Sequence, residues 1–236
     1  MIFRDEEITI FFGDNSTAPF TGQEFKENIE SNKVFLQERV SKFPITANKY
    51  IFLHQIHSIE GKIFTNNFNA FDLQSDYLVT QIPEVALGVL TADCLPIVFS
   101  DSVNRVVAVA HAGWRGSIDG ISQKVINKLQ EEFKTNLDNL KIYFGPSAKK
   151  CCYEVSEEFL VHSSGRIFEK SIISKNKKLF FDNVNYNRLK LMALGVQEER
   201  LNLNFSVCTI CNLNFASHRR GAESAKRQVT LIKLNA

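Results

Sequence analysis

Residues 95–110 read Leu-Pro-Ile-Val-Phe-Ser-Asp-Ser-Val-Asn-Arg-Val-Val-Ala-Val-Ala, two short apolar runs separated by a polar turn. Apolar and β-branched runs of about five residues with turn residues between them favour strands over helices. We therefore predict a hairpin in which residues 95–99 run out and residues 106–110 run back. Similar runs at residues 85–90 and 140–144 predict two more buried strands.

After this hairpin the apolar residues change to a helical spacing. Ser117 is the expected N-cap of a helix that reaches about Lys134. Further helices are predicted near residues 154–163 and 185–194, and a final strand at residues 228–234. Interspersed strands and helices predict an α/β to α+β fold, in which a mixed, sandwich-like β-sheet core is flanked by helices. We expect one domain over residues 1–236.

Composition excludes several classes of protein. The chain has 236 residues with 28 basic and 26 acidic side chains and a net charge of +2, without a basic block, so we expect no nucleic-acid partner. No stretch reaches the ~20 apolar residues of a membrane span, so we expect no membrane partner. The acidic residues near Met1 do not fit a signal peptide. We expect a cytoplasmic monomer or small homo-oligomer.

Five cysteines are reduced in that compartment and free to act as ligands or nucleophiles. Their odd number and clumped spacing argue against a disulfide framework: Cys94, Cys151, Cys152, Cys208 and Cys211. A Cys-x-x-Cys pair such as Cys208 and Cys211 is half a zinc site or a redox motif. Adjacent side chains diverge on a strand, so Cys151 and Cys152 are not expected to complete it. The sequence favours a packing role for this pair.

The residues most able to do chemistry lie at the ends of predicted strands. Cys94 and His111 flank the hairpin and return to the same sheet edge, where antiparallel neighbours lie roughly 5 Å apart. His54 and His57 stand in a third such segment, residues 52–58. Three protein ligands could hold zinc with an open fourth position, or His111 could activate Cys94 as a nucleophile. The residues alone leave both mechanisms open, besides a plain packing role.

Five motifs occur in an order that resembles one known family, the purine nucleoside phosphorylases formerly labelled multicopper polyphenol oxidases or laccases. The motifs span roughly residues 50–232: Gln55-Ile-His57, Thr91-Ala-Asp-Cys-Leu-Pro96, Ala110-His-Ala-Gly-Trp-Arg-Gly116, Gly145-Pro-Ser147 with Tyr153-Glu-Val155, and Cys208-Thr-Ile-Cys211 with Ser217-His-Arg-Arg220. Any one of them alone is a weak signal, but the combination is specific.

The resemblance implies a cytoplasmic enzyme that holds one Zn²⁺ per chain through His57, Cys94 and His111. It also implies phosphorolysis of adenosine, inosine and 5′-methylthioadenosine, with adenosine deamination by the same protein. The partners would then be a purine nucleoside and phosphate. The laccase label fits poorly, because multicopper oxidases need several histidine-rich sites and the chain has five histidines.

Other catalytic assignments depend on single charged residues. Arg115 is a candidate phosphate ligand, because a guanidinium grips phosphate bidentately; pairing with Asp93 to brace the turn is the alternative. Asp93 either orients a zinc ligand or caps the turn. Arg219 and Arg220 either line an anion pocket or lie exposed on the surface.

The chain also departs from the family pattern. Residues 11–17, Phe-Phe-Gly-Asp-Asn-Ser-Thr, replace a segment that normally contains Gly-Gly-Val-Ser. His218 stands where the family has tyrosine, and adds a group that titrates near neutral pH. The usual glycine is missing before the arginine of residues 221–228. We expect these changes to alter contacts with the substrate, and the altered segment at residues 11–17 leaves a non-catalytic nucleoside- or metal-binding protein as an alternative to an enzyme.

Overall fold

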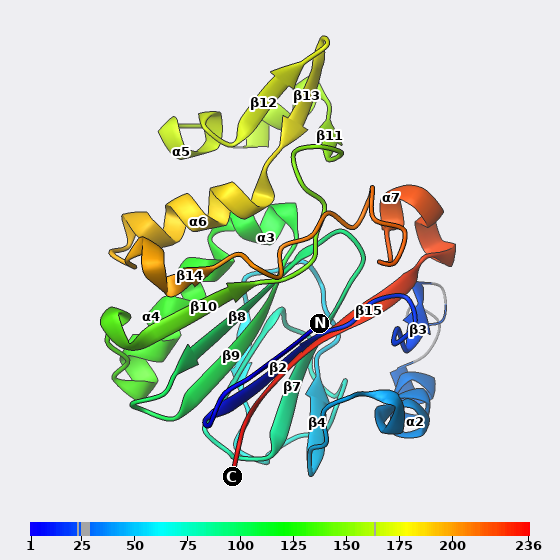
Figure 1. Cartoon of the computed structure of the whole chain (residues 1–236), viewed down its shortest axis with the longest axis vertical. Coiled ribbons are helices and arrows are strands. Elements are labelled where there is room, and N and C mark those ends of the chain that lie inside the picture. Colours follow the sequence, from blue (N-terminus) through cyan, green and yellow to red (C-terminus); the bar gives the residue numbers. More distant parts are fainter. Residues whose placement is uncertain (23, 25–28, 163) are drawn as a thin grey trace.

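Two mixed β-sheets lie face to face at the centre of the molecule (Figure 1). The structure is a computed structural model that describes residues 1–22, 24, 29–162 and 164–236. In these residues, the first sheet has the order β1 (Ile2–Arg4), β2 (Ile8–Phe12), β15 (Lys226–Leu234), β7 (Val85–Thr91) and β4 (Lys49–Phe52), and β3 (Phe20–Thr21) also pairs with β15. The second has the order β14 (Leu201–Asn202), β10 (Leu140–Phe144), β8 (Leu95–Asp101), β9 (Val106–Ala112), β6 (Tyr77–Thr80) and β5 (Gly61–Ile63).

The hairpin predicted from residues 95–110 is confirmed. Strands β8 and β9 are antiparallel, with Leu95 opposite Ala112 and Pro96 opposite His111. Every residue of β7, β8 and β9 is buried. Their apolar runs are unbroken because the sheets are covered on both faces, which leaves no side of these strands for polar residues.

Three apolar clusters explain the layers. One fills the space between the sheets and includes Ile10, Leu87, Val109 and Ile232. A second packs the outer face of the β8–β9 sheet against helices α4 (Ile121–Phe133) and α6 (Asn183–Ala193). A third lies on the outer face of the other sheet, beside α2 (Ile29–Arg39). The predicted mixed α/β fold with a sandwich core is therefore confirmed.

The prediction of a single helix that begins at Ser117 is wrong in one respect. The segment forms two helices, α3 (Trp114–Asp119) and α4, because Gly120 adopts a left-handed φ of 95° between them. Gly113 and Gly120 are their N-caps, whereas Ser117 lies buried inside α3. The helix expected at residues 185–194 is confirmed as α6, with Gly195 at φ 98° behind it.

A small three-stranded sheet projects from the main body, formed by β11 (Glu154–Val155), β13 (Lys178–Phe181) and β12 (Ile172–Lys175) (Figure 1). The helix predicted near residues 154–163 is therefore wrong: it is replaced by β11 and the 3-10 helix η3 (Glu157–His162), and residue 163 lies outside the described residues. The ladder with β13 and the aromatic cluster around Phe159 and Phe181 override the local helical pattern.

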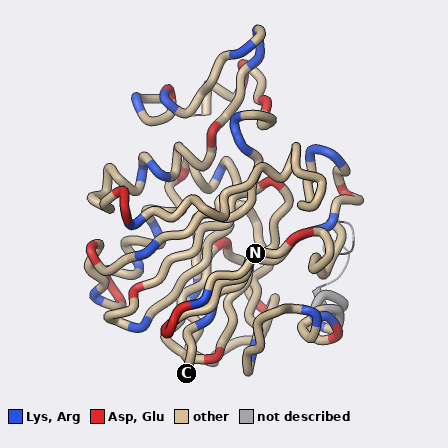
Figure 2. The backbone as a smooth tube through the Cα atoms, viewed as in Figure 1, with Lys and Arg blue, Asp and Glu red and all other residues tan. Residues whose placement is uncertain are grey.

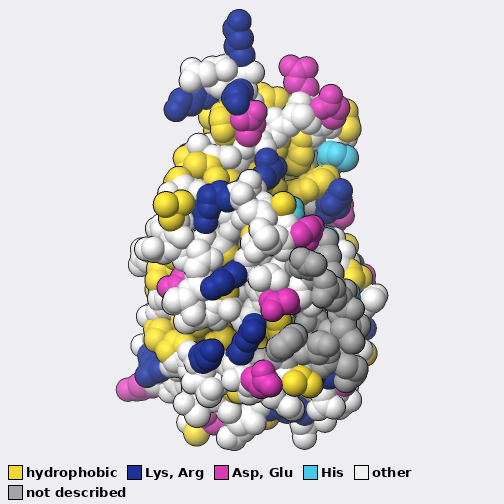
Figure 3. Space-filling model, turned by 90° about the vertical axis from the view of Figure 1, so that its right-hand side faces the viewer, with side chains coloured by type: hydrophobic (Ala, Val, Ile, Leu, Met, Phe, Trp, Pro, Cys, Tyr) yellow, Lys and Arg dark blue, Asp and Glu magenta, His cyan; other side chains and the backbone are white. Residues whose placement is uncertain are grey.

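Charge and apolar surface are distributed unevenly around this projection. Figure 2 shows acidic and basic residues interspersed over the main body, with basic residues at the tip of the β12–β13 hairpin. Figure 3 shows hydrophobic side chains on the surface just below the projection.

The remaining short elements are α5 (Arg166–Glu169), α7 (His218–Gly221) and the 3-10 helices η1 (Val40–Lys42), η2 (Leu137–Asn139), η4 (Glu198–Arg200) and η5 (Ala222–Ser224). No helix in the described residues is long and apolar enough to cross a membrane.

Candidate metal centre

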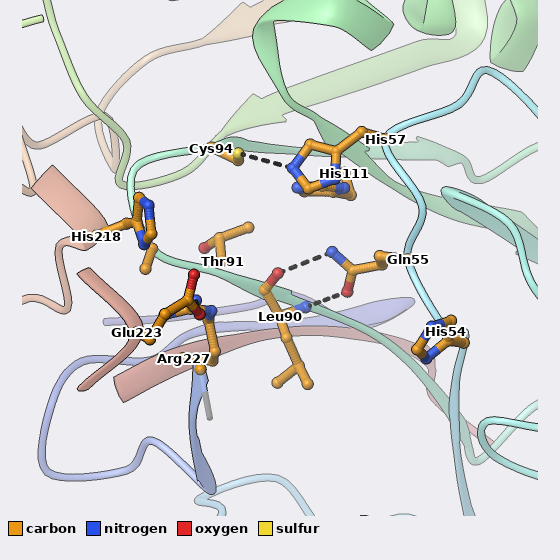
Figure 4. A pocket seen from close by; sticks show the side chains of 12 residues that line it. His54, Gln55, His57, Leu90, Thr91, Cys94, His111, His218, Glu223 and Arg227 are labelled. Carbon is orange, nitrogen blue, oxygen red and sulfur yellow. Dashed lines mark hydrogen bonds and ion pairs between the residues drawn. The ribbon is translucent and has the colours of Figure 1, made fainter. Parts of the chain in front are cut away.

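Cys94 and His111 meet at the open end of the β8–β9 hairpin, where the sequence placed them. The ladder sets Pro96 opposite His111, so the chain just before β8 lies beside the end of β9. His57 joins them from the loop after β4, and the ligand atoms of all three lie within 4.8 Å of one another. The thiol of Cys94 lies 3.9 Å from His57 Nε2. The three residues named as metal ligands are thus brought together (Figure 4).

The loop that carries His57 is held by side chains from neighbouring strands. Gln55 bonds both backbone groups of Leu90, donating from Nε2 at 2.8 Å and accepting at Oε1 at 2.8 Å. This side chain continues the β4–β7 pairing beyond the last residue of β4. His57 itself has a left-handed φ of 61°, a conformation that persists only where surrounding contacts impose it. The loop is therefore shaped to present the imidazole.

Asp76 supplies those contacts and was missed by the sequence reasoning. Its carboxylate is fully buried and accepts hydrogen bonds from the amides of Ile56, His57 and Ser58 and from the Ser58 hydroxyl. It also lies 2.8 Å from His111 Nδ1. A carboxylate on one ring nitrogen fixes the imidazole tautomer and leaves the other nitrogen for a metal. The signal was a single acid immediately before an apolar strand, which gives no hint of its partners.

The titration of the centre follows from these contacts. Burial raises the pKa of Cys94, but the charge of His111 and hydrogen bonds from both histidines lower it to about 6. Burial lowers the pKa of His111, whereas the Cys94 charge and the Asp76 hydrogen bond raise it to about 9. Without a metal, the pair is thiolate and imidazolium at neutral pH. Binding of a cation would displace the extra proton, because a ligating imidazole is neutral.

The three donors fit zinc. Typical Zn–S and Zn–N bonds of about 2.3 Å and 2.0–2.1 Å place sulfur and nitrogen about 3.6 Å apart in a tetrahedron, close to the 3.9 Å between Cys94 and His57. A thiolate with two imidazoles is a donor set that zinc accepts. Three protein ligands leave one tetrahedral position for water or substrate. The residues therefore fit a metal ion.

A cavity of about 400 Å³ opens beside the three residues (Figure 4). This volume is within the range of small-molecule sites. The cavity is lined by Gly22, His54, Gln55, His57, Leu90, Thr91, Ala92, Cys94, His111, His218, Glu223 and Arg227. The Thr91 hydroxyl is buried and has no hydrogen-bond partner among the described residues.

Arg227 is the second residue that sequence reasoning missed. It reaches the cavity because β15, at the other end of the chain, pairs with β7, with Gln228 opposite Thr91. Its guanidinium lies 3.9 Å from Glu223 and donates to the Ala225 carbonyl. A Cβ added to Gly22 would stand 2.3 Å from this guanidinium. The same Cβ would stand 2.9 Å from the Glu223 carbonyl oxygen, so a larger residue at position 22 would require the backbone of Glu223 to shift.

Asp93 has a bracing position one residue before Cys94. Its φ is 81°, and its carboxylate accepts from the Thr209 and Ser217 hydroxyls at 2.7 and 3.0 Å and from the Arg219 amide at 2.7 Å. These donors come from the segment before α7 and from its first residues. Asp93 thus fixes the turn that presents Cys94.

None of the three arginines considered as anion ligands from the sequence is among the cavity residues. Arg115 is exposed on α3, 4.5 Å from the Trp114 ring, and is not among the cavity residues. Arg219 lies over the Tyr153 ring and donates to the Glu154 carbonyl. Arg220 donates to the carbonyls of a loop, those of Thr209, Ile210 and Phe215.

The structure also gives the positions of two departures from the family pattern and of the two remaining histidines. His218 lines the cavity, and its Nδ1 lies 3.1 Å from the Ala222 carbonyl. Residues 11–17 run beside β15 and are not among the cavity residues. His54 lines the cavity but is not grouped with the three ligands. His162 is exposed at the end of η3, 4.8 Å from the Trp114 ring.

The other four cysteines correct an expectation. Cys151 and Cys152 lie in a turn and not on a strand, so their side chains do not diverge as predicted. They join Cys208 and Cys211 in a group whose sulfurs all lie within 4.8 Å of one another. All five cysteines of the chain are free thiols.

Comparison with known proteins gives one consistent group. The family model described as "Multi-copper polyphenol oxidoreductase laccase" matches residues 16–235. A protein of Clostridium acetobutylicum named purine nucleoside phosphorylase is 31% identical over 98% of this chain and 93% of its own length. Adenosine deaminase RL5, from an unknown prokaryotic organism, is 32% identical over 75% of this chain and 72% of its own. The crystal structure of the hypothetical protein YfiH from Bacillus licheniformis superposes with a TM-score of 0.84 at 22% identity, covering 97% of this chain and 93% of that one.

Proposed function

Since this chain belongs to the multi-copper polyphenol oxidoreductase laccase family, whose curated relatives include purine nucleoside phosphorylases, we propose that it is an enzyme acting on purine nucleosides. In its finer form, the proposal is a zinc-dependent phosphorylase. It converts adenosine, inosine and 5′-methylthioadenosine, with phosphate, to the free base and the corresponding ribose 1-phosphate or methylthioribose 1-phosphate. Adenosine deamination is a second activity of the same centre, as the name of one relative suggests.

One observation carries this proposal. Three metal-binding side chains converge on one wall of a cavity that also presents the Arg227 guanidinium. A phosphorylase must hold a neutral nucleoside and an anion side by side, and a cavity with a metal centre and a separate cation can do so. Arg227 is suited to phosphate because its planar guanidinium donates two parallel hydrogen bonds to phosphate oxygens.

The residues of the chain divide the work as follows. Zinc held by His57, Cys94 and His111 would supply a Lewis acid and an activated water in the open position. Asp76 keeps the His111 proton on Nδ1, so that Nε2 remains free to ligate. Arg227, which lines the cavity, positions the phosphate oxygen that attacks C1′ as the glycosidic C–N bond breaks. Asp93 acts indirectly, by holding the turn before Cys94.

Arg115 is the weaker candidate for phosphate. It lies exposed on α3 and stacks on Trp114, whereas Arg227 lines the cavity. A copper oxidase reaction is also disfavoured, because the centre has two histidines and one cysteine, fewer ligands than several copper sites require.

The test is phosphate-dependent release of hypoxanthine from inosine, measured with zinc content on the same protein. We expect one zinc at this centre, and loss of that ion and of activity in His111→Ala. His162→Ala is the matched control, because that histidine is exposed and lies outside the cavity. Adenosine with and without phosphate separates phosphorolysis from deamination.

Two results would contradict the proposal. Full activity in His111→Ala would show that a metal at this centre takes no part in the reaction. Stoichiometric labelling of Cys94 by a substrate-like electrophile, in a protein purified without metal and unable to release base, would favour a cysteine hydrolase. That second reading has its own support in the lowered pKa of Cys94 beside His111.

A further inference from the structure

Four cysteines that the proposed reaction does not use meet outside the cavity. Cys151 and Cys152 lie in the turn after β10, where the amide of Cys152 donates to the Lys149 carbonyl at 2.9 Å. Cys208 and Cys211 lie at the two ends of a turn before α7. Backbone hydrogen bonds join these segments, from Ser147 to Val207 and from Thr209 to Ser147, each at 3.0 Å. The fold thus brings two cysteine pairs, about 60 residues apart in sequence, to one point.

The spacing of the sulfurs matches a tetrahedral cage. All four lie within 4.8 Å of one another, and Cys151 and Cys211 are separated by 4.0 Å. Zn–S bonds of about 2.3 Å in a regular tetrahedron place the sulfurs about 3.8 Å apart. Closing the cage on a cation therefore requires shifts of less than about 1 Å, within the reach of side-chain rotation.

Packing alone does not explain this group. Cys151 and Cys211 are exposed and Cys152 is half-buried; only Cys208 is buried. Apolar packing gains little from thiols in water, whereas four thiols on one centre are the ligand set of a closed structural zinc site.

The surroundings also suit an anionic centre. A tetrathiolate zinc carries a formal charge of about −2, and Lys149, two residues before Cys151, donates to the Ser206 carbonyl in the segment that leads to Cys208. Arg220 donates to the carbonyls of Thr209 and Ile210, inside the second cysteine turn.

We propose that Cys151, Cys152, Cys208 and Cys211 form a second metal site, which holds a structural Zn²⁺ in a closed tetrathiolate cage. This site is separate from the centre at His57, Cys94 and His111, and it raises the zinc content expected from the sequence from one ion per chain to two. It does not depend on the proposed nucleoside reaction.

The site also has a position from which it can support the other centre. Thr209, between Cys208 and Cys211, bonds the carboxylate of Asp93, and the Ala148 amide donates to the Asp93 carbonyl at 2.9 Å. Both linked segments therefore contact the residue that precedes Cys94. A cation that ties the segments together stabilises the turn that presents this ligand.

The experiment is zinc analysis of the full chain, purified in reducing buffer without added metal. We expect about two zinc ions per chain in the wild type and about one in Cys211→Ser. Cys94→Ser is the matched control: the same substitution in the other centre should also leave about one, retained in the cage. Cys211→His should keep about two, because zinc also accepts a Cys₃His set, and this variant guards against simple misfolding of Cys211→Ser.

Cobalt identifies which site is which. Thiolate-to-cobalt absorption grows with the number of thiolate ligands, so Cys211→Ser should remove most of it and Cys94→Ser little. A wild type with about one zinc, unchanged in Cys211→Ser and lost in Cys94→Ser, would overturn the proposal. So would a disulfide between Cys151 and Cys211 found by mass spectrometry of the freshly purified protein. Loss of nucleoside turnover with about two zinc ions present would contradict the proposed function and leave this site intact.

Discussion

Two cysteine-containing centres stand at different distances from the cavity, and their ligand sets differ in kind. The His57, Cys94 and His111 centre has three donors and opens into the cavity, whereas the Cys151, Cys152, Cys208 and Cys211 cage has four donors. Catalytic zinc sites keep a position for substrate, and structural sites fill it with a fourth residue. The number of donors therefore separates a centre that can bind and activate a substrate from a centre that can only hold its metal ion.

The supports of the two centres also differ. The open centre is positioned by the ends of long strands and by Asp76, a fully buried carboxylate with hydrogen bonds to three amides and two side chains. The cage is built from two turns tied by backbone hydrogen bonds around Ser147. Rigid supports suit a site that must keep its geometry while one ligand position changes, whereas a cage is held by the ion itself.

The largest expected effect tests the role of Asp76. In Asp76→Asn, the carboxylate that orients His111 and the His57 loop is lost, and we expect zinc affinity and kcat/KM to fall by about 10–100-fold. Asp101→Asn is the matched control, a fully buried aspartate at the other end of the hairpin whose partner is Asn104. Zinc affinity is measured by competition with a chelator.

The cage provides an internal reference for this experiment. Asp76→Asn should retain the cage zinc. Asp76 bonds to the His57 loop and to His111, and none of its hydrogen-bond partners is one of the four cage cysteines. Equal loss of both ions would show that the substitution unfolds the protein and would remove the difference between the two centres.

The sequence predicted the open centre better than the cage for a physical reason. A hairpin returns its ends to one edge whatever its exact register, so Cys94 and His111 could be paired from residues 95–110 alone. The apolar runs of residues 85–90 and 140–144 and the alternation of residues 228–234 likewise predicted β7, β10 and β15. The cage depends on turns, in which the direction of adjacent side chains is set by backbone angles that composition does not reveal.

Long-range contacts account for the other differences. Asp76 lies 35 positions before His111, and Arg227 lies near the far end of the chain. Only sheet pairing brings these two residues to the site. The helix expected near residues 154–163 was lost to β11, because pairing with β13 and packing around Phe181 outweigh local spacing. The break at Gly120 required a left-handed residue that the apolar period could not show.

A smaller effect is expected at the anion side of the open centre. Arg227→Ala should raise the KM for phosphate by about tenfold or more, because a hydrogen bond to a charged group contributes about 1.5–3 kcal/mol. The KM for nucleoside and the zinc content should change little. Arg115→Ala serves as the comparison, since that guanidinium stacks on Trp114 outside the cavity. A larger phosphate effect from Arg115→Ala than from Arg227→Ala would move the anion site to α3.

The smallest effect concerns the crowding of the open centre by Gly113. A Cβ at this position would stand 2.9 Å from His57 Cδ2 and 3.4 Å from the Cys94 sulfur. Its φ of −61° is ordinary for alanine, so Gly113→Ala should not strain the backbone; it should push the His57 ring by a few tenths of an ångström. We expect a severalfold loss of zinc affinity with little change in the free energy of unfolding of the metal-free protein.

Gly120→Ala is the converse and completes the test. Its φ of 95° is left-handed, and the nearest atom to an added Cβ lies 3.9 Å away. Alanine there should cost about 1 kcal/mol in the free energy of unfolding, with no change in zinc affinity. Denaturant unfolding of the metal-free proteins and chelator competition separate the two quantities. If Gly113→Ala left zinc affinity unchanged, His57 would have room to move, and the open centre would be less preorganised than its contacts with Asp76 indicate.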